Sequence, residues 1–102
     1  MQTHPAKRVE ITIEAPMERR LRKVLKDADI TGYTIVPVRG GSGRSGEWTR
    51  EGQVGRSGMV QFQIIIRPDR LGGLLDAAFA VVEKQIGVVC ITDAQVLRAE
   101  RF

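Results

Sequence analysis

The chain repeats one pattern of apolar residues, and this internal repeat constrains the fold more than any other feature. In each copy, alternating apolar residues precede a proline and then a segment in which apolar residues recur every three or four positions. Alternation is typical of a half-buried strand, and the longer spacing is typical of an amphipathic helix. The matching positions are Val9, Ile11 and Ile13 with Val60, Phe62 and Ile64, Pro16 with Pro68, and Leu21, Val24, Leu25 and Ala28 with Leu71, Leu74, Leu75 and Ala78.

A further strand is predicted after each helix. The first covers residues 33–39, where Pro37 cannot donate to a sheet ladder and therefore indicates an edge strand or a bulge. The second covers residues 88–92 and can continue past a bulge near Asp93 towards Val96. In the second helix we expect Phe79 to face the core together with the leucines.

A doubled strand–helix–strand unit predicts an α+β fold, the ferredoxin-like βαββαβ sandwich. In that fold a four-stranded antiparallel sheet carries two helices on one face, and here a long loop separates strands 2 and 3. The 102 residues fit a single domain, residues 1–102. Two helices leave the other face of the sheet uncovered, so we expect a ligand, RNA or more protein there, and oligomerisation is the favoured solution.

The long segment 39–58 is the most informative part of the sequence for function. It is rich in Gly, Ser and Arg, and it has almost no aliphatic residues from which a core could be built. Loops of this length in compact domains are usually functional or disordered, and we expect a flexible loop. Clustered glycines let backbone amides point at an anion, and arginines clamp phosphate or carboxylate. Trp48 is an aromatic in a polar loop, which favours a contact with a partner.

Charge and composition bound the function without defining it. The formal net charge of +4 suits nucleic acid, an anionic membrane surface or phosphate ligands. The basic face of residues 18–27 could bind polyanions, although a solvated helix surface with a Glu18–Arg22 pair is the simpler interpretation. No apolar run reaches the ~20 residues that span a bilayer, and no secretory signal is present. The single Cys90 cannot form an internal disulfide, so a cytoplasmic location is predicted, with Cys90 buried as a small apolar residue.

The residues offer little for catalysis. His4 and Cys90 are far apart and His4 lies near the terminus, so no metal site is predicted. No nucleophile motif or acid–base pair is present, and an enzyme is therefore not expected. RNA-recognition domains share the fold but need several aromatics on the inner strands for base stacking, whereas the third strand offers only Phe62. An RNA-binding module remains an alternative, and nucleic acid is not a favoured partner.

With these motifs in place, the sequence resembles the PII signal-transduction family over nearly its whole length, from about Arg8 to Phe102. The strongest match runs from residues 32–34 through 39–44, and it looks like the family's second strand leading into its T-loop. Residues 96–98 look like the end of its last strand. The glycine-rich residues 40–46, Trp48, residues 50–52 and the C-terminal residues 98–102 are similar to the carboxysome-associated PII-like subgroup.

The resemblance implies a homotrimer whose sheets face inward and whose three clefts between subunits bind adenine nucleotide. Carried over by position, the nucleotide-binding residues are Thr34, Gly40, Gly41, Ser42, Gly43, Gly87, Val88, Val89, Arg98 and Arg101. A bicarbonate site would be formed by Gly41, Ser42, Gly43 and Arg44, and the loop residues Arg44, Trp48 and Arg50 would contact a partner such as a bicarbonate transporter or a carboxysome-associated protein. The implied ligands are ADP or AMP, with ATP as a further candidate, and bicarbonate; no prosthetic group is implied.

Several positions depart from the nitrogen-regulatory members of the family. Tyr33, the only tyrosine, is predicted on a strand, so the loop has no tyrosine for uridylylation. Residues 86–89 lack the Gly-Lys pair of the family's B-loop, and Arg44 replaces a glutamine that holds Mg-ATP and 2-oxoglutarate. Glu100 also replaces an arginine. These departures favour a regulator that senses ADP or AMP and bicarbonate, and so reports energy and inorganic-carbon status. A PII-type nitrogen regulator is the alternative within the family.

Overall fold

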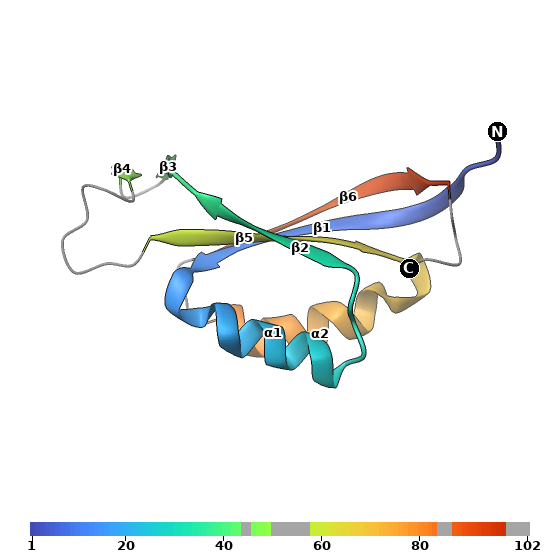
Figure 1. The fold of residues 1–102 in the computed structure, drawn as a ribbon, viewed down its shortest axis with the longest axis horizontal. Coiled ribbons are helices and arrows are strands. Elements are labelled where there is room, and N and C mark those ends of the chain that lie inside the picture. Colours follow the sequence, from blue (N-terminus) through green and yellow to red (C-terminus); the bar gives the residue numbers. More distant parts are fainter. Residues whose placement is uncertain (44–45, 50–57, 84–86, 98–102) are drawn as a thin grey trace.

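The computed structural model describes residues 1–43, 46–49, 58–83 and 87–97 of the chain. Six strands and two α-helices follow one another, with a turn of 3-10 helix before each α-helix (Figure 1). The strands are β1 (His4–Glu14), β2 (Tyr33–Val38), β3 (Gly40–Gly43), β4 (Gly46–Thr49), β5 (Met59–Ile66) and β6 (Val88–Val96), and the helices are α1 (Glu18–Asp27) and α2 (Leu71–Val82).

Four of the strands form one antiparallel sheet in the order β2-β5-β1-β6. Both helices lie on the same face of this sheet, and the other face is open (Figure 1). This is the predicted ferredoxin-like arrangement. It also confirms that Pro37 lies on an edge strand, because β2 has only β5 as a neighbour in the sheet.

The core lies between the sheet and the helices, and the alternation of the strands explains its composition. Val9, Ile11 and Ile13 from β1 are completely buried, and their even-numbered neighbours point to the open face. Leu21 and Leu25 of α1 are equally buried, one turn apart on the inner face of the helix. The remaining core side chains come from β5, α2 and the connection from α1 to β2: Phe62, Ile64, Ile66, Leu74, Ala78, Val81 and Ile30.

Several polar side chains of the open face bond to one another, and the apolar Val36, Ile65 and Val88 lie on the same face. Gln63 donates to Gln61 at 3.0 Å, and Gln61 donates to Thr12 at 3.1 Å. On the same face the Arg8 guanidinium lies 3.3 Å from the Glu10 carboxylate. A partner that covers this face would therefore meet hydrogen-bonded polar side chains together with apolar ones.

Four details differ from the sequence-based expectations. Phe79 is 61% exposed, and Val81 takes the core position instead. Cys90 is exposed, since β6 is an edge strand and Cys90 lies opposite Glu10 on the open face. His4 belongs to β1, where it pairs with Val96, and the ladder between β1 and β6 runs through Asp93 without a bulge.

The segment between β2 and β5 contains regular structure that was not predicted. Strands β3 and β4 form a separate two-stranded sheet in which Gly40 pairs with Thr49 and Gly43 with Gly46. Gly46 has φ +106°, a conformation that favours glycine. The hairpin extends from the end of the main sheet (Figure 1). The predicted flexibility of residues 39–58 remains a prediction, and residues 44–45 and 50–57 lie outside the described residues.

Candidate functional site

The glycine-rich residues predicted to bind ligand form the first strand of the small hairpin. Gly40, Gly41, Ser42 and Gly43 make up β3, where Gly41 pairs with Trp48 and Ser42 with Glu47. Gly41, Ser42 and Gly43 are exposed, so their backbone is accessible. A Cβ on Gly43 would meet nothing within 4 Å. The strand therefore presents unhindered backbone, which suits contact with a small anion or a phosphate.

Thr34 lies on the strand that leads into this hairpin. It is exposed, and it pairs with Gln63 of β5, which places it on the open face of the sheet. β2 ends at Val38 and β3 begins at Gly40, so only Arg39 separates the strand that carries Thr34 from the hairpin.

Gly87 lies at the opposite edge of the sheet, in close contact with β1. A Cβ built on Gly87 would lie 2.8 Å from the Thr12 carbonyl oxygen and 3.4 Å from Cγ2 of Ile13. No side chain fits there without displacing backbone, so this glycine allows β6 to begin directly against β1. Val88 and Val89 follow on β6, opposite Thr12 and Ile11, and both are exposed.

A single chain does not bring these two groups of residues together. The hairpin extends from the β2 edge, whereas residues 87–89 begin β6 at the other edge, with β5 and β1 between them. Three strand spacings separate the edges, which is about 14 Å. Both groups nevertheless lie at the same end of the sheet, because Val38, Met59 and Glu14 are in register there and Thr12 pairs with Val88 close by.

The remaining predicted site residues can be placed only in part. Trp48 lies on β4 opposite Gly41, and its side chain is outside the described part of the structure. The predicted residues that lie outside the described residues altogether are Arg44, Arg50, Arg98 and Arg101.

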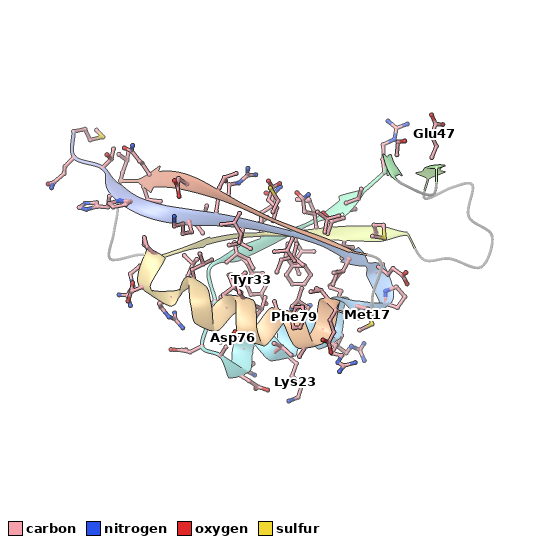
Figure 2. All side chains as sticks on the ribbon, turned by 180° about the vertical axis from the view of Figure 1, so that it is seen from behind. Met17, Lys23, Tyr33, Glu47, Asp76 and Phe79 are labelled. Carbon is pink, nitrogen blue, oxygen red and sulfur yellow. The ribbon has the colours of Figure 1, made fainter. Side chains whose placement is uncertain are left out.

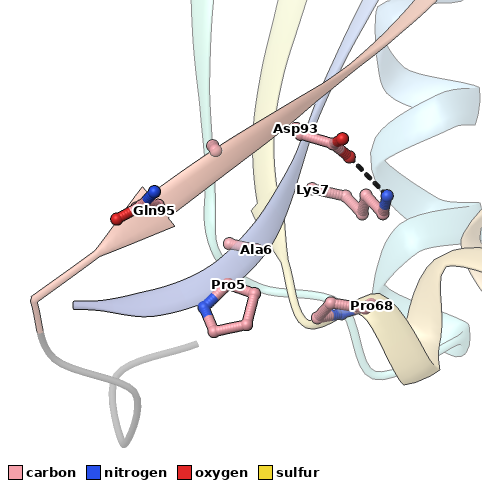
Figure 3. A pocket seen from close by; sticks show the side chains of 7 residues that line it. Pro5, Ala6, Lys7, Pro68, Asp93 and Gln95 are labelled. Carbon is pink, nitrogen blue, oxygen red and sulfur yellow. Dashed lines mark hydrogen bonds and ion pairs between the residues drawn. The ribbon is translucent and has the colours of Figure 1, made fainter.

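The structure also shows a shallow pocket that the sequence analysis missed. Its volume is about 380 Å³. It lies between Pro5 and Pro68 (Figure 3), at the end of β1 and β6 away from the hairpin. Lys7 and Asp93 form an ion pair at 2.5 Å on its wall. The hydrogen bond from Lys7 and its positive charge lower the pKa of the Asp93 carboxyl. No motif could have revealed this pocket, because its residues meet only through strand register.

The described residues contain no evident catalytic or metal centre. Within residues 1–43, 46–49, 58–83 and 87–97, no three His, Cys, Asp or Glu side chains are grouped so that they could hold a metal ion. In the same part of the chain, no helix is both long and apolar enough to cross a membrane. What the described residues offer at this end of the sheet is the exposed glycine backbone of β3.

Comparison with known proteins agrees with this class of small ferredoxin-like binding protein. The family model described as nitrogen regulatory protein P-II matches residues 6–101. The chain therefore belongs to the P-II family. No curated protein matches the sequence.

Solved structures of one PII-like protein are similar to this chain over nearly its full length. CPII from Thiomonas intermedia K12, a nitrogen regulatory PII-like protein bound to ADP, AMP and bicarbonate, is 26% identical, with a TM-score of 0.82 over 95% of this chain and 92% of that chain. CPII bound to ADP and bicarbonate is 29% identical, with a TM-score of 0.79 over 95% and 93% of the two chains. Its apo form is 27% identical, with a TM-score of 0.72 over 95% and 97%.

Proposed function

We propose that this protein is a PII-like regulator that binds adenine nucleotide, with ADP and AMP favoured over ATP, and also binds bicarbonate. The observation that carries the proposal is the similarity, at 26–29% identity and over 95% of this chain, to CPII structures bound to ADP, AMP and bicarbonate. The exposed glycine strand β3 agrees with it, since backbone amides are suitable ligands for phosphate and bicarbonate alike. We propose a regulatory role rather than an enzymatic one.

The proposed nucleotide site lies between two copies of the chain. The β2 edge and the β6 edge are about 14 Å apart within one chain, so they meet only if one copy's β2 edge approaches another copy's β6 edge. We propose that one copy contributes Thr34 and residues 40–43, and that its neighbour contributes residues 87–89. In this arrangement Arg98 and Arg101 supply positive charge for the phosphates.

The assembly that follows is a closed ring, and a homotrimer with inward-facing sheets is our proposal. Heterologous contacts between two different edges generate rings when the rotation closes. The open sheet face would then line the interior, and its hydrogen-bonded glutamines, Thr12 and the Arg8–Glu10 pair would not need apolar cover. Light scattering coupled to size-exclusion chromatography would measure the mass of the assembly, and a monomer at micromolar concentration would contradict the shared site.

Bicarbonate is proposed to bind at the base of the hairpin, where Gly41, Ser42 and Gly43 would donate amides and Arg44 its guanidinium. Ligand binding would shift the population of segment 39–58 towards one conformation. That conformation would present or hide Arg44, Trp48 and Arg50 from a cytoplasmic or membrane-associated partner, such as a bicarbonate transporter or a carboxysome protein. The ligand needs differential affinity for the two conformations for such a shift to occur.

Calorimetric titrations of ATP, ADP and AMP, each with and without bicarbonate, test the proposal. We expect ADP or AMP to bind, and bicarbonate to change the affinity. The Arg44→Ala variant should lose the bicarbonate effect, while Arg67→Ala, which removes an exposed arginine of the β5–α2 connection, should behave as wild type. Absence of heat with every nucleotide, or an unchanged bicarbonate effect in Arg44→Ala, would refute the assigned site.

The family model's description keeps a nitrogen-regulatory function as the second candidate. A regulator of that type responds to 2-oxoglutarate together with ATP. Calorimetry also distinguishes the nitrogen-regulatory function from our proposal, because under our proposal 2-oxoglutarate added in the presence of Mg-ATP should give no heat of binding. Saturable 2-oxoglutarate binding would favour the second candidate.

A further inference from the structure

We propose that the outer face of α1 docks an acidic helical segment of a partner protein. The surface consists of Arg19, Arg22, Lys23 and Lys26, which we call the α1 cation stripe. The proposal concerns a surface that is separate from the hairpin and from residues 87–89, so it does not depend on the proposed nucleotide site.

The chain's positive charge is concentrated on this helix. Five cations and two carboxylates give α1 a formal charge of +3, against +4 for the whole chain. The neighbouring α2 contains only one charged residue, Asp76, within Leu71–Val82. The outer surface of the helical layer is therefore divided into a basic helix and a nearly neutral one.

Helical spacing places the four stripe residues on a single face. Arg22, Lys23 and Lys26 lie three, four and seven positions after Arg19, so each stripe residue has another one three or four positions away, where side chains are neighbours on a helix. All four are exposed, and Lys23 points away from the sheet (Figure 2). The opposite face is held in the core by Leu21 and Leu25, both fully buried, so the stripe cannot rotate inward.

The arrangement breaks two local rules of helix stability. Arg19 and Lys23, like Arg22 and Lys26, are like charges at i,i+4, which repel each other. Arg19 also stands in the first turn of α1, where the helix dipole disfavours a cation. Carboxylates offset the repulsion only in part: Arg22 lies 3.7 Å from Glu18, and Lys23 lies 3.0 Å from Asp27. Within the described residues, neither Arg19 nor Lys26 has an ion-pair partner. A stripe that is locally unfavourable and exposed is expected where it serves recognition.

The shape of the stripe favours an acidic helix over other anionic partners. Its length, from Arg19 to Lys26, is about 10 Å, or two helical turns, and its i, i+3, i+4, i+7 spacing matches carboxylates at the same spacing on a facing helix. A membrane-bound helix inserts its apolar face into the lipid interface, but the apolar face of α1 is occupied by the core. Recognition of unpaired bases relies on stacking aromatic side chains, and the exposed residues of Glu18–Asp27 include none, so nucleic acid would be held here only through its phosphates.

The experiment uses a synthetic helical peptide with glutamates at i, i+3, i+4 and i+7 and a scrambled peptide of the same composition. Fluorescence anisotropy measures their binding to the wild type, to Arg19→Gln/Lys26→Gln, and to the control Arg20→Gln/Arg67→Gln. Both double variants lower the net charge equally and change only exposed side chains. Arg19→Gln/Lys26→Gln, the stripe variant, loses two exposed ion pairs to the glutamate-patterned peptide, so its affinity for that peptide should be about tenfold lower than that of the wild type. The control variant should change this affinity less than about threefold.

The proposal is overturned if the scrambled peptide binds as well as the patterned one, or if the control loses as much affinity as the stripe variant. Phosphatidylserine vesicles and duplex DNA are measured in parallel, and stripe-dependent binding of either in preference to the peptide would also overturn it. Circular dichroism shows whether the variants fold. Nucleotide binding to the stripe variant should equal that of the wild type, which separates this proposal from the proposed function.

Discussion

The glycine at the start of β6 offers the sharpest test of how the candidate site is built. Gly87 has no left-handed backbone conformation, so alanine is acceptable in its dihedral angles. The obstacle is space: the added Cβ would lie 2.8 Å from the Thr12 carbonyl oxygen, which is backbone and cannot rotate away. Gly87→Ala must therefore push the start of β6 away from β1.

Overpacking of this kind costs about 1–3 kcal/mol. For a domain of this size, each kcal/mol lowers the Tm by roughly 4–8 °C, so a central value of about 2 kcal/mol predicts a Tm that is lower by roughly 8–16 °C. Differential scanning calorimetry at one fixed protein concentration measures it, because the Tm of an oligomer depends on concentration. The same displacement should weaken nucleotide binding, since Val88 and Val89 move with Gly87.

The matched control is Gly73→Ala on α2. A Cβ on Gly73 meets nothing within 4 Å, and alanine has the higher helix propensity, so this variant should be more stable than the wild type by about 0.5–1 kcal/mol. The same substitution is thus expected to act in opposite directions at the two positions. A Gly87→Ala protein with an unchanged or higher Tm would show that the close approach of β6 to β1 is not as described.

Three further predictions concern the scaffold. Leu25→Ala empties a fully buried position and should lower the free energy of unfolding by about 2–5 kcal/mol in urea titrations, whereas a loss below about 1 kcal/mol would contradict its place in the core. Arg70 donates to the carbonyls of Ala28 and Asp29, directly after α1, at 3.0 and 3.2 Å, so Arg70→Ala should lower the free energy of unfolding by about 1 kcal/mol. In hydrogen exchange, the amides of the last turn of α1 should lose protection, and unchanged protection there would refute the capping role. The folded pKa of Asp93 is lowered by Lys7, so the stabilisation from this pair is present above the ordinary value of 3.8 and is lost as the pH falls through the folded pKa. In NMR titrations, Lys7→Met should return the Asp93 pKa towards its ordinary value. An Asp93 pKa that is the same in the variant as in the wild type would exclude the ion pair.

Periodicity predicted the fold because the two kinds of apolar spacing leave little choice of element. Phe62 and Ile64, placed by their alternation on the inner face of a strand, are fully buried on β5, which lies in the centre of the sheet. Phe79 was placed in the core by the same reasoning, and this was wrong. Helical spacing indicates which residues share a face, but how far that face is covered depends on how the sheet lies above it.

The hairpin within segment 39–58 was missed for a related reason. Gly40–Gly43 contains only glycine and serine, and glycine is depleted in strands. Trp48 and Thr49 favour strands, but the four residues of Gly46–Thr49 are too few to predict one. Their backbone hydrogen bonds, rather than their side chains, define the two strands. Cys90 shows the converse: its apolar neighbours suggested burial, and only the strand order reveals that β6 is an edge.

The sequence by itself determined the repeated strand–helix–strand order, the inner faces of β1, β5 and α1, and the glycine-rich character of the segment after β2, because these depend on residue type and local spacing. Tertiary structure alone decided that the hairpin and residues 87–89 lie at opposite edges of one end of the sheet, and that Lys7 meets Asp93. Such neighbours are set by strand order and register, and these follow from the packing of the whole chain rather than from any local segment.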